Sequence, residues 1–223
     1  LMMNDTFHNL GFGDEKQDSK GNPSGGVNDN GVYDPAYSYI VIVATQNNTK
    51  VQVTPTTPCV GIAKGETKTV LLQRGQTYVV RAVGQNVNSR MSGTHIKSNK
   101  PVAVTIGEDS AYPSYFTKSG DCEDYVGDQI VPVEVTGRKY IVVQGQGYAP
   151  SAGHQGATGS KNFYEMVAVT ATEDNTTVSV DGAQFGSTLQ KGETITIELE
   201  DPNAIYTFIE ANNPVYAFHI SGY

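Results

Sequence analysis

The sequence predicts an all-β protein built from two homologous antiparallel β-sandwich-like lobes that arose by internal duplication. Three observations predict this class. Short β-branched runs alternate with turns rich in Gly and Asn, no long stretch has the 3.6-residue period of a helix, and three blocks occur twice in the same order. With 38% hydrophobic residues among 223, the chain has enough apolar side chains for packed cores.

The first repeated block predicts a strand, a turn and a second strand. Residues 44–53 (ATQNNTKVQV) recur 127 positions later as residues 171–180 (ATEDNTTVSV). The β-branched runs at 39–43 and 166–170 precede the two copies and predict one strand in each lobe. Because Asn and Asp tolerate a positive φ angle, we expect such an angle at one of these residues in each turn. The alternation of apolar and polar residues beyond the turn predicts a half-buried second strand.

The second repeated block predicts a short hairpin connection. Residues 72–77 (LQRGQT) recur 117 positions later as residues 189–194 (LQKGET). Gly75 and Gly192 are expected to adopt the positive φ that such a connection needs. The strands predicted to follow the two copies are residues 78–80 and 195–197.

The third repeated block predicts the last strand of each lobe. Residues 96–102 recur 113 positions later as residues 209–215. We expect a turn in each copy that ends at Pro101 or Pro214, because proline is tolerated at the first position of a strand. The decreasing offsets are expected if only the loops between the blocks changed length.

The duplication divides the chain into two predicted domains. We expect the first lobe at residues 1–121 and the second at residues 122–223, with a linker strand assigned to the second lobe. The second lobe opens on a strand at 138–143. The matching strand of the first lobe is expected to be truncated to residues 1–3, as in a fragment of a longer precursor.

Charge and motif content exclude several function classes. The net charge is −8 without a Lys/Arg cluster, so nucleic acid and anionic membranes are poor partners. No apolar run is long enough for a membrane-spanning helix. No nucleophile elbow is present, and the four histidines have no partners at metal-ligand spacing. We therefore predict that the protein is not an enzyme and needs no cofactor.

Two features leave alternatives open. Cys59 and Cys122 lack a Cys-x-x-Cys partner, which excludes a structural zinc site, and a disulfide and two buried thiols fit the sequence equally well. The linker carries acidic residues whose oxygens could bind Ca²⁺, but their spacing is not that of an EF-hand. A solvated acidic loop is the favoured interpretation. The acidic residues are Asp121, Glu123, Asp124 and Asp128.

At the repeated blocks the sequence resembles the IgG Fc-binding protein N-terminal domain family. The resemblance rests on Asn48 to Val51, Leu72 to Thr77, Gly93 to Val104 and the linker from Cys122 to Pro132. It implies an extracellular or cell-surface binding or adhesion module, of the kind found in secreted and surface proteins of bacteria. The implied partners are a host or surface glycoprotein, mucin, glycan or immunoglobulin. Fc binding itself depends on surface residues rather than on the fold.

The ligand contacts are predicted to lie on loops held by a rigid β scaffold. The two longest irregular segments, about 4–33 and 144–162, arise at corresponding positions of the two lobes, and loops of this length are often functional. Two other functions fit the sequence: a structural spacer in a surface array, and a carbohydrate-binding module of a larger secreted protein. The candidate contacts are Phe7, His8, Phe12, Tyr33, Tyr148 and His154.

Overall fold

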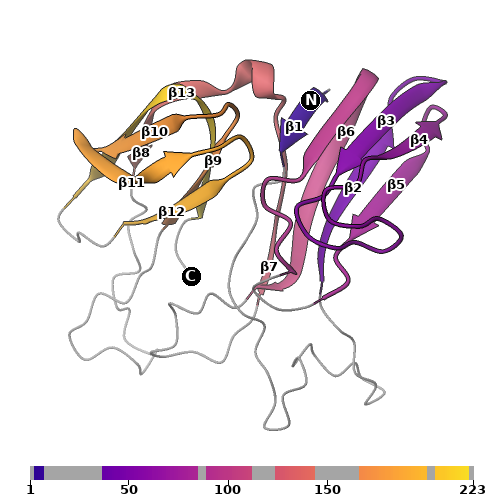
Figure 1. The fold of residues 1–223 in the computed structure, drawn as a ribbon, viewed down its shortest axis with the longest axis horizontal. Coiled ribbons are helices and arrows are strands. Elements are labelled where there is room, and N and C mark those ends of the chain that lie inside the picture. Colours follow the sequence, from indigo (N-terminus) through magenta and orange to yellow (C-terminus); the bar gives the residue numbers. More distant parts are fainter. Residues whose placement is uncertain are drawn as a thin grey trace, which may run out of the picture. The chain divides into compact units, whose positions relative to one another are not determined.

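The computed structural model confirms the all-β class (Figure 1). Its chain divides into two compact units, Leu1–Val135 and Thr136–Tyr223, and each unit contains one curled antiparallel sheet. A short 3₁₀ helix, η3 (Val133–Val135), closes the first unit. The structure describes residues 3–7, 37–84, 89–111, 124–143, 166–199 and 204–220.

The first unit has a seven-stranded sheet within its described residues. The strand order is β4-β3-β6-β2-β5, and β1 and β7 also pair with β6. The long strand β6 is therefore the spine to which the other strands attach. The strands are β1 (Met3–Phe7), β2 (Ser38–Ala44), β3 (Thr49–Thr54), β4 (Lys68–Leu72), β5 (Thr77–Arg81), β6 (His95–Ala111) and β7 (Asp124–Gln129).

The second unit repeats this topology in a six-stranded sheet, again counting its described residues. The strand order is β11-β10-β13-β9-β12, and β8 pairs with β13. Strands β8 to β13 thus correspond in chain order to β1 to β6. Their bounds are β8 (Gly137–Val143), β9 (Met166–Ala171), β10 (Thr176–Val180), β11 (Ala183–Leu189), β12 (Thr194–Glu198) and β13 (Tyr206–Ile220).

The pairing register of the two sheets confirms the duplication. Ile42 lies opposite Val104 in the first unit, and Val169 lies opposite Ala217 in the second. These partners are displaced by the same 127 and 113 positions that separate the sequence repeats. The repeat offsets of 127, 117 and 113 likewise relate Ile42–Tyr78 to Val169–Ile195, Val53–Ile96 to Val180–Ile209 and Thr49–Leu72 to Thr176–Leu189.

The repeated turns have the backbone angles that the sequence predicts. Asn48 and Asn175 have φ of 55° and 58°, and Gly75 and Gly192 have φ of 82° and 84°. The amide nitrogens of both glycines donate to the carbonyl oxygen of the last residue of β2 or β9, Ala44 or its counterpart in the second unit, at 2.8 Å. The residues that recur are thus accounted for by the geometry of the scaffold.

Alternation along β2 places one face of the first sheet in a core, whereas every residue of β9 in the second sheet is buried. In β2 the residues alternate between buried and half-buried, and Ile40 and Ile42 are fully buried. Burying such a side chain contributes about 1.5–3 kcal/mol. The second unit has its own cluster, formed by Val142, Val167, Val169, Ala171, Val178, Leu189, Ile197, Leu199, Ile209, Ala211 and Val215.

The turn expected before Pro101 is wrong, because β6 runs through the proline without interruption. Residues up to Ser98 pair with β3, and residues from Val102 onward pair with β2. Proline has no N–H to give to a ladder, and it lies where the strand exchanges one partner for the other. The Thr45 hydroxyl donates to the Pro101 carbonyl oxygen at 2.6 Å. Strand β13 passes through Pro214 in the same way.

The linker strand belongs to the first unit and not to the second, so the division falls after Val135 instead of at 121/122. Strand β7 pairs with β6, and the amide of Ile130 just beyond it donates to the Val104 carbonyl oxygen at 3.1 Å. Ile130 is fully buried. The linker therefore completes the first core, a long-range pairing that its local sequence does not reveal.

The first strand also differs from its predicted position. Strand β1 comprises Met3–Phe7 instead of residues 1–3, and it pairs with β6. The register places Met3 opposite Val102, as Gly137 of β8 lies opposite Val215. The matching strand predicted for the first lobe is thus present.

Candidate binding surface

Among the predicted ligand contacts, Phe7 is the one that falls within the described residues. It lies in strand β1, opposite His95, and not in a loop. The prediction of a loop position is therefore wrong for this residue. The other candidates lie outside the described residues: His8, Phe12, Tyr33, Tyr148 and His154.

The acidic linker is partly a strand. Asp124 and Asp128 belong to β7, and an Asp128 carboxylate oxygen accepts a hydrogen bond from the Gln129 amide at 2.6 Å. The predicted loop is therefore corrected to a paired strand at these positions, while Asp121 and Glu123 lie outside the described residues. Within those residues, no group of three or more His, Cys, Asp or Glu could hold a metal ion.

Cys59 is a buried free thiol, and Cys122 lies outside the described residues. The Cys59 sulfur donates a hydrogen bond to the Thr57 carbonyl oxygen at 3.4 Å. Burial raises the pKa of this thiol to about 11. Because only the thiolate is a good nucleophile, the environment gives Cys59 a packing role.

The outward side of β2 and β5 forms a surface that no sequence motif marks. The inward residues of β2 are buried, so alternation places Tyr39 and Val41 on the opposite side. Cross-strand pairing sets Arg81 opposite Tyr39 and Val79 opposite Val41. We call this region the arginine–tyrosine surface, and define it as Tyr37, Tyr39, Val60, Val79, Arg81 and Val83.

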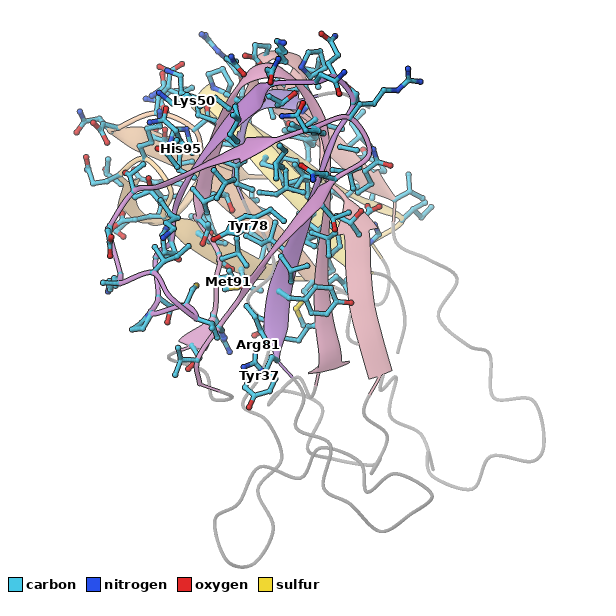
Figure 2. The ribbon with its side chains drawn as sticks, turned by 90° about the vertical axis from the view of Figure 1, so that its right-hand side faces the viewer. Tyr37, Lys50, Tyr78, Arg81, Met91 and His95 are labelled. Carbon is cyan, nitrogen blue, oxygen red and sulfur yellow. The ribbon has the colours of Figure 1, made fainter. Side chains whose placement is uncertain are left out.

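Two ring contacts fix the polar centre of this surface. The Arg81 guanidinium carbon lies 4.0 Å from the centroid of the Tyr37 ring (Figure 2). Such a cation–π contact contributes about 0.5–1 kcal/mol at an exposed site. The Tyr39 ring lies across Gly107 so closely that an added Cβ would be 2.6 Å from Tyr39 Cζ. Glycine is therefore what allows the ring to lie against the sheet.

Exposed valines surround this centre. Val60, Val79 and Val83 are each more than half exposed, at 56%, 54% and 57%. Two backbone hydrogen bonds hold the segment of Val60 beside the end of β5: Val60 N donates to Arg81 O at 2.9 Å, and Val83 N donates to Pro58 O at 3.1 Å. An arginine and tyrosines among exposed aliphatic side chains have the composition of an interface hot spot.

The sequence contained a partial signal for this surface. Alternation along 39–43 and 77–81 separates outward from inward residues, and it could have placed Tyr39 and Arg81 on one side. The contact of Tyr39 with Gly107 could not have been found, because it joins strands that are distant in the sequence.

These observations define a duplicated all-β protein with one curled antiparallel sheet in each unit. The first unit has an ordered, partly apolar surface suited to contact with another macromolecule. The family model described as IgGFc binding protein matches residues 25–223, and the chain belongs to this family. Membership implies an extracellular or surface binding module. Within the described ranges, no helix is both long and apolar enough to cross a bilayer.

The other comparisons add little. No curated protein matches the chain. Among solved structures, a chain in a cryo-EM structure of broad bean stain virus is 10% identical, covers 84% of this chain and 73% of its own, and has a TM-score of 0.17. A similarity this low carries no argument about fold or function.

Proposed function

We propose that this protein is an extracellular adhesion or binding module that recognises a protein partner, an immunoglobulin or another secreted glycoprotein, through the arginine–tyrosine surface. The observation that carries the proposal is the stacking of Arg81 on Tyr37 beside exposed valines. Binding of this kind needs no catalytic group and no cofactor.

The arrangement favours binding because its side chains are ordered before the partner arrives. Arginine and tyrosine supply large contact areas, and a side chain that is already fixed loses less conformational entropy on association. The Tyr37 ring positions Arg81, and Gly107 allows Tyr39 to lie flat.

The test compares single variants for binding to immobilised IgG Fc, mucin and a panel of other secreted glycoproteins. We expect Arg81→Ala and Tyr37→Ala each to lower affinity at least 10-fold, which corresponds to about 1.4 kcal/mol. Lys64→Ala is the matched control, because it removes the same charge from an exposed residue outside the surface. It should leave affinity within about 2-fold.

Two outcomes contradict the proposal. Wild-type affinity in both the Arg81 and Tyr37 variants, with unchanged unfolding midpoints, removes this surface from the interface. Failure of the wild-type protein to bind any glycoprotein of the panel is the result expected of a structural spacer.

A further inference from the structure

The second unit presents a different outward face, which begins with a row of polar side chains across four strands. Lys139 of β8 lies opposite Glu210 of β13, and Glu210 lies opposite Ser179 of β10. Ser179 in turn lies opposite Gln184 of β11. Because paired residues in a sheet point to the same side, these four side chains form one ladder.

An aromatic and aliphatic strip lies beside the polar row on the same face. Phe208 and Tyr206 precede Glu210 by two and four positions on β13, so alternation points them to the same side. Phe208 lies opposite Ile141, and Tyr206 lies opposite Val143. Tyr206 is 59% exposed and Phe208 is half-buried, so aromatic rings are accessible next to the polar groups.

Three residues of the polar row, Ser179, Gln184 and Glu210, line an open depression of about 410 Å³, and Lys139 and the aromatic strip lie outside this lining. The depression is lined by side chains from three strands and by the tight turn at Gly182. Its polar lining residues are Thr177, Ser179, Gln184, Glu210 and Asn212.

Several of these polar groups are available to a ligand. One carboxylate oxygen of Glu210 forms a salt bridge with the Lys139 ammonium at 2.8 Å, which leaves the other oxygen available. Within the described part of the chain, the side-chain amide of Gln184 and the side-chain hydroxyl of Thr177 form no hydrogen bond. Asn212 is already engaged, since it accepts from the Thr177 amide at 2.7 Å and donates to the Asn175 carbonyl oxygen at 3.0 Å.

We propose that this depression binds a neutral pyranose of an oligosaccharide. A pyranose carries hydroxyls that both donate and accept along its edge, which suits an amide, a hydroxyl and a carboxylate oxygen side by side. The C–H face of the next sugar along the oligosaccharide is apolar and packs on the aromatic rings of Phe208 and Tyr206 beside the depression. An anionic sugar is disfavoured, because Glu210 is acidic and the chain carries a net charge of −8.

The first unit lacks the two aromatic residues that β13 contributes to the site. There Gln52 lies opposite Thr69, as Ser179 lies opposite Gln184, so polar groups are present at matching positions. The positions of Tyr206 and Phe208, displaced by 113, are however Gly93 and His95. The proposed sugar site is therefore specific to the second unit, and it does not rest on the arginine–tyrosine surface.

The experiment uses the full chain on an array of neutral and sialylated oligosaccharides, followed by saturation-transfer NMR with a free neutral oligosaccharide from the array. We expect binding to neutral sugars, lowered at least 10-fold by Gln184→Ala and by Tyr206→Ala. Thr69→Ala is the matched control, at the register position of Gln184 in the first unit, and should leave binding unchanged. Both Gln184 and Tyr206 are exposed, so these variants should keep the unfolding midpoint of the wild type.

The outcomes separate this proposal from the proposed function. Arg81→Ala should leave sugar binding intact. Loss of sugar binding in that variant would overturn the assignment of the sugar site to the second unit. The proposal also fails if the wild type binds no oligosaccharide, if it binds only sialylated ones, or if Gln184→Ala and Tyr206→Ala bind as the wild type does.

Discussion

The packing of the Tyr39 ring on Gly107 predicts that Gly107→Ala destabilises the first unit only while the Tyr39 ring is present. In Gly107→Ala the new Cβ would lie 2.6 Å from Tyr39 Cζ and 2.7 Å from its hydroxyl oxygen. Overpacking of a close contact costs about 1–3 kcal/mol. The atoms that the Cβ meets are at the far end of the side chain, so the ring can swing away from the sheet. We therefore expect about 1–2 kcal/mol, within that range.

The destabilisation caused by Gly107→Ala should disappear or reverse when the Tyr39 ring is removed. Gly107 does not have a positive φ, so alanine is compatible with its backbone. In a Tyr39→Ala background, Gly107→Ala should be neutral or stabilise the first unit by about 0.4–1 kcal/mol, because it restricts the unfolded chain. The coupling energy between the two positions should then be about 1–3 kcal/mol.

The assay is guanidinium-induced unfolding of the four proteins of this double-mutant cycle, followed by circular dichroism at the transition of the first unit. Gly75→Ala serves as the control, because its φ of 82° makes alanine strained while no atom lies within 4 Å of the added Cβ. Its destabilisation should be the same with and without Tyr39. If Gly107→Ala has equal effects in both backgrounds, the ring contact does not explain the glycine.

Two further predictions concern the turns and the buried thiol. Asn48→Ala and Asn175→Ala should each destabilise their unit by about 1–2 kcal/mol because of the left-handed backbone, whereas glycine at either position should be nearly neutral in equilibrium unfolding. A large effect in one unit alone would show that the two turns are not equivalent. Because the pKa of Cys59 is raised from 9.0 to about 11, the unfolded thiol ionises first, and the free energy of unfolding should fall as pH rises from about 9 to 11. Cys59→Ala should remove this part of the pH dependence, and an unchanged profile would contradict the raised pKa.

The parts of the fold that could be predicted are those that local sequence determines. Asn48 and Gly75 predict turns because few other residues accept a positive φ, and both angles are as expected. The presence of two copies also strengthened the strand predictions, because a block that occurs twice in the same order indicates matching strands in the two units. The strand pairing then followed the repeat offsets in the structure.

The parts that could not be predicted depend on pairing between distant segments. Pro101 signalled a break, yet β6 continues because its partner changes at that residue. The linker was assigned to the second lobe, although β7 completes the first sheet. The candidate surface was missed for the same reason, since the position of Tyr39 depends on Gly107, a residue of another strand.

The comparison of the two units separates scaffold from function. Asp5 lies opposite Lys97 in the first unit, and Lys139 lies opposite Glu210 at the same register in the second. Residues of opposite charge thus stand at this register position in both sheets, with the acidic residue on β1 in the first unit and on β13 in the second.

Other positions differ between the units without such compensation, and Met166, the counterpart of Tyr39, is buried. Arg81 lies opposite Tyr39, whereas its counterpart Glu198 lies opposite Met166. His95 is likewise replaced by Phe208. The shared topology does not require these changes, because the two sheets have the same strand order with different residues at these positions. The uncompensated positions are where each unit is free to acquire its own partner, and both surfaces proposed to bind ligands contain them.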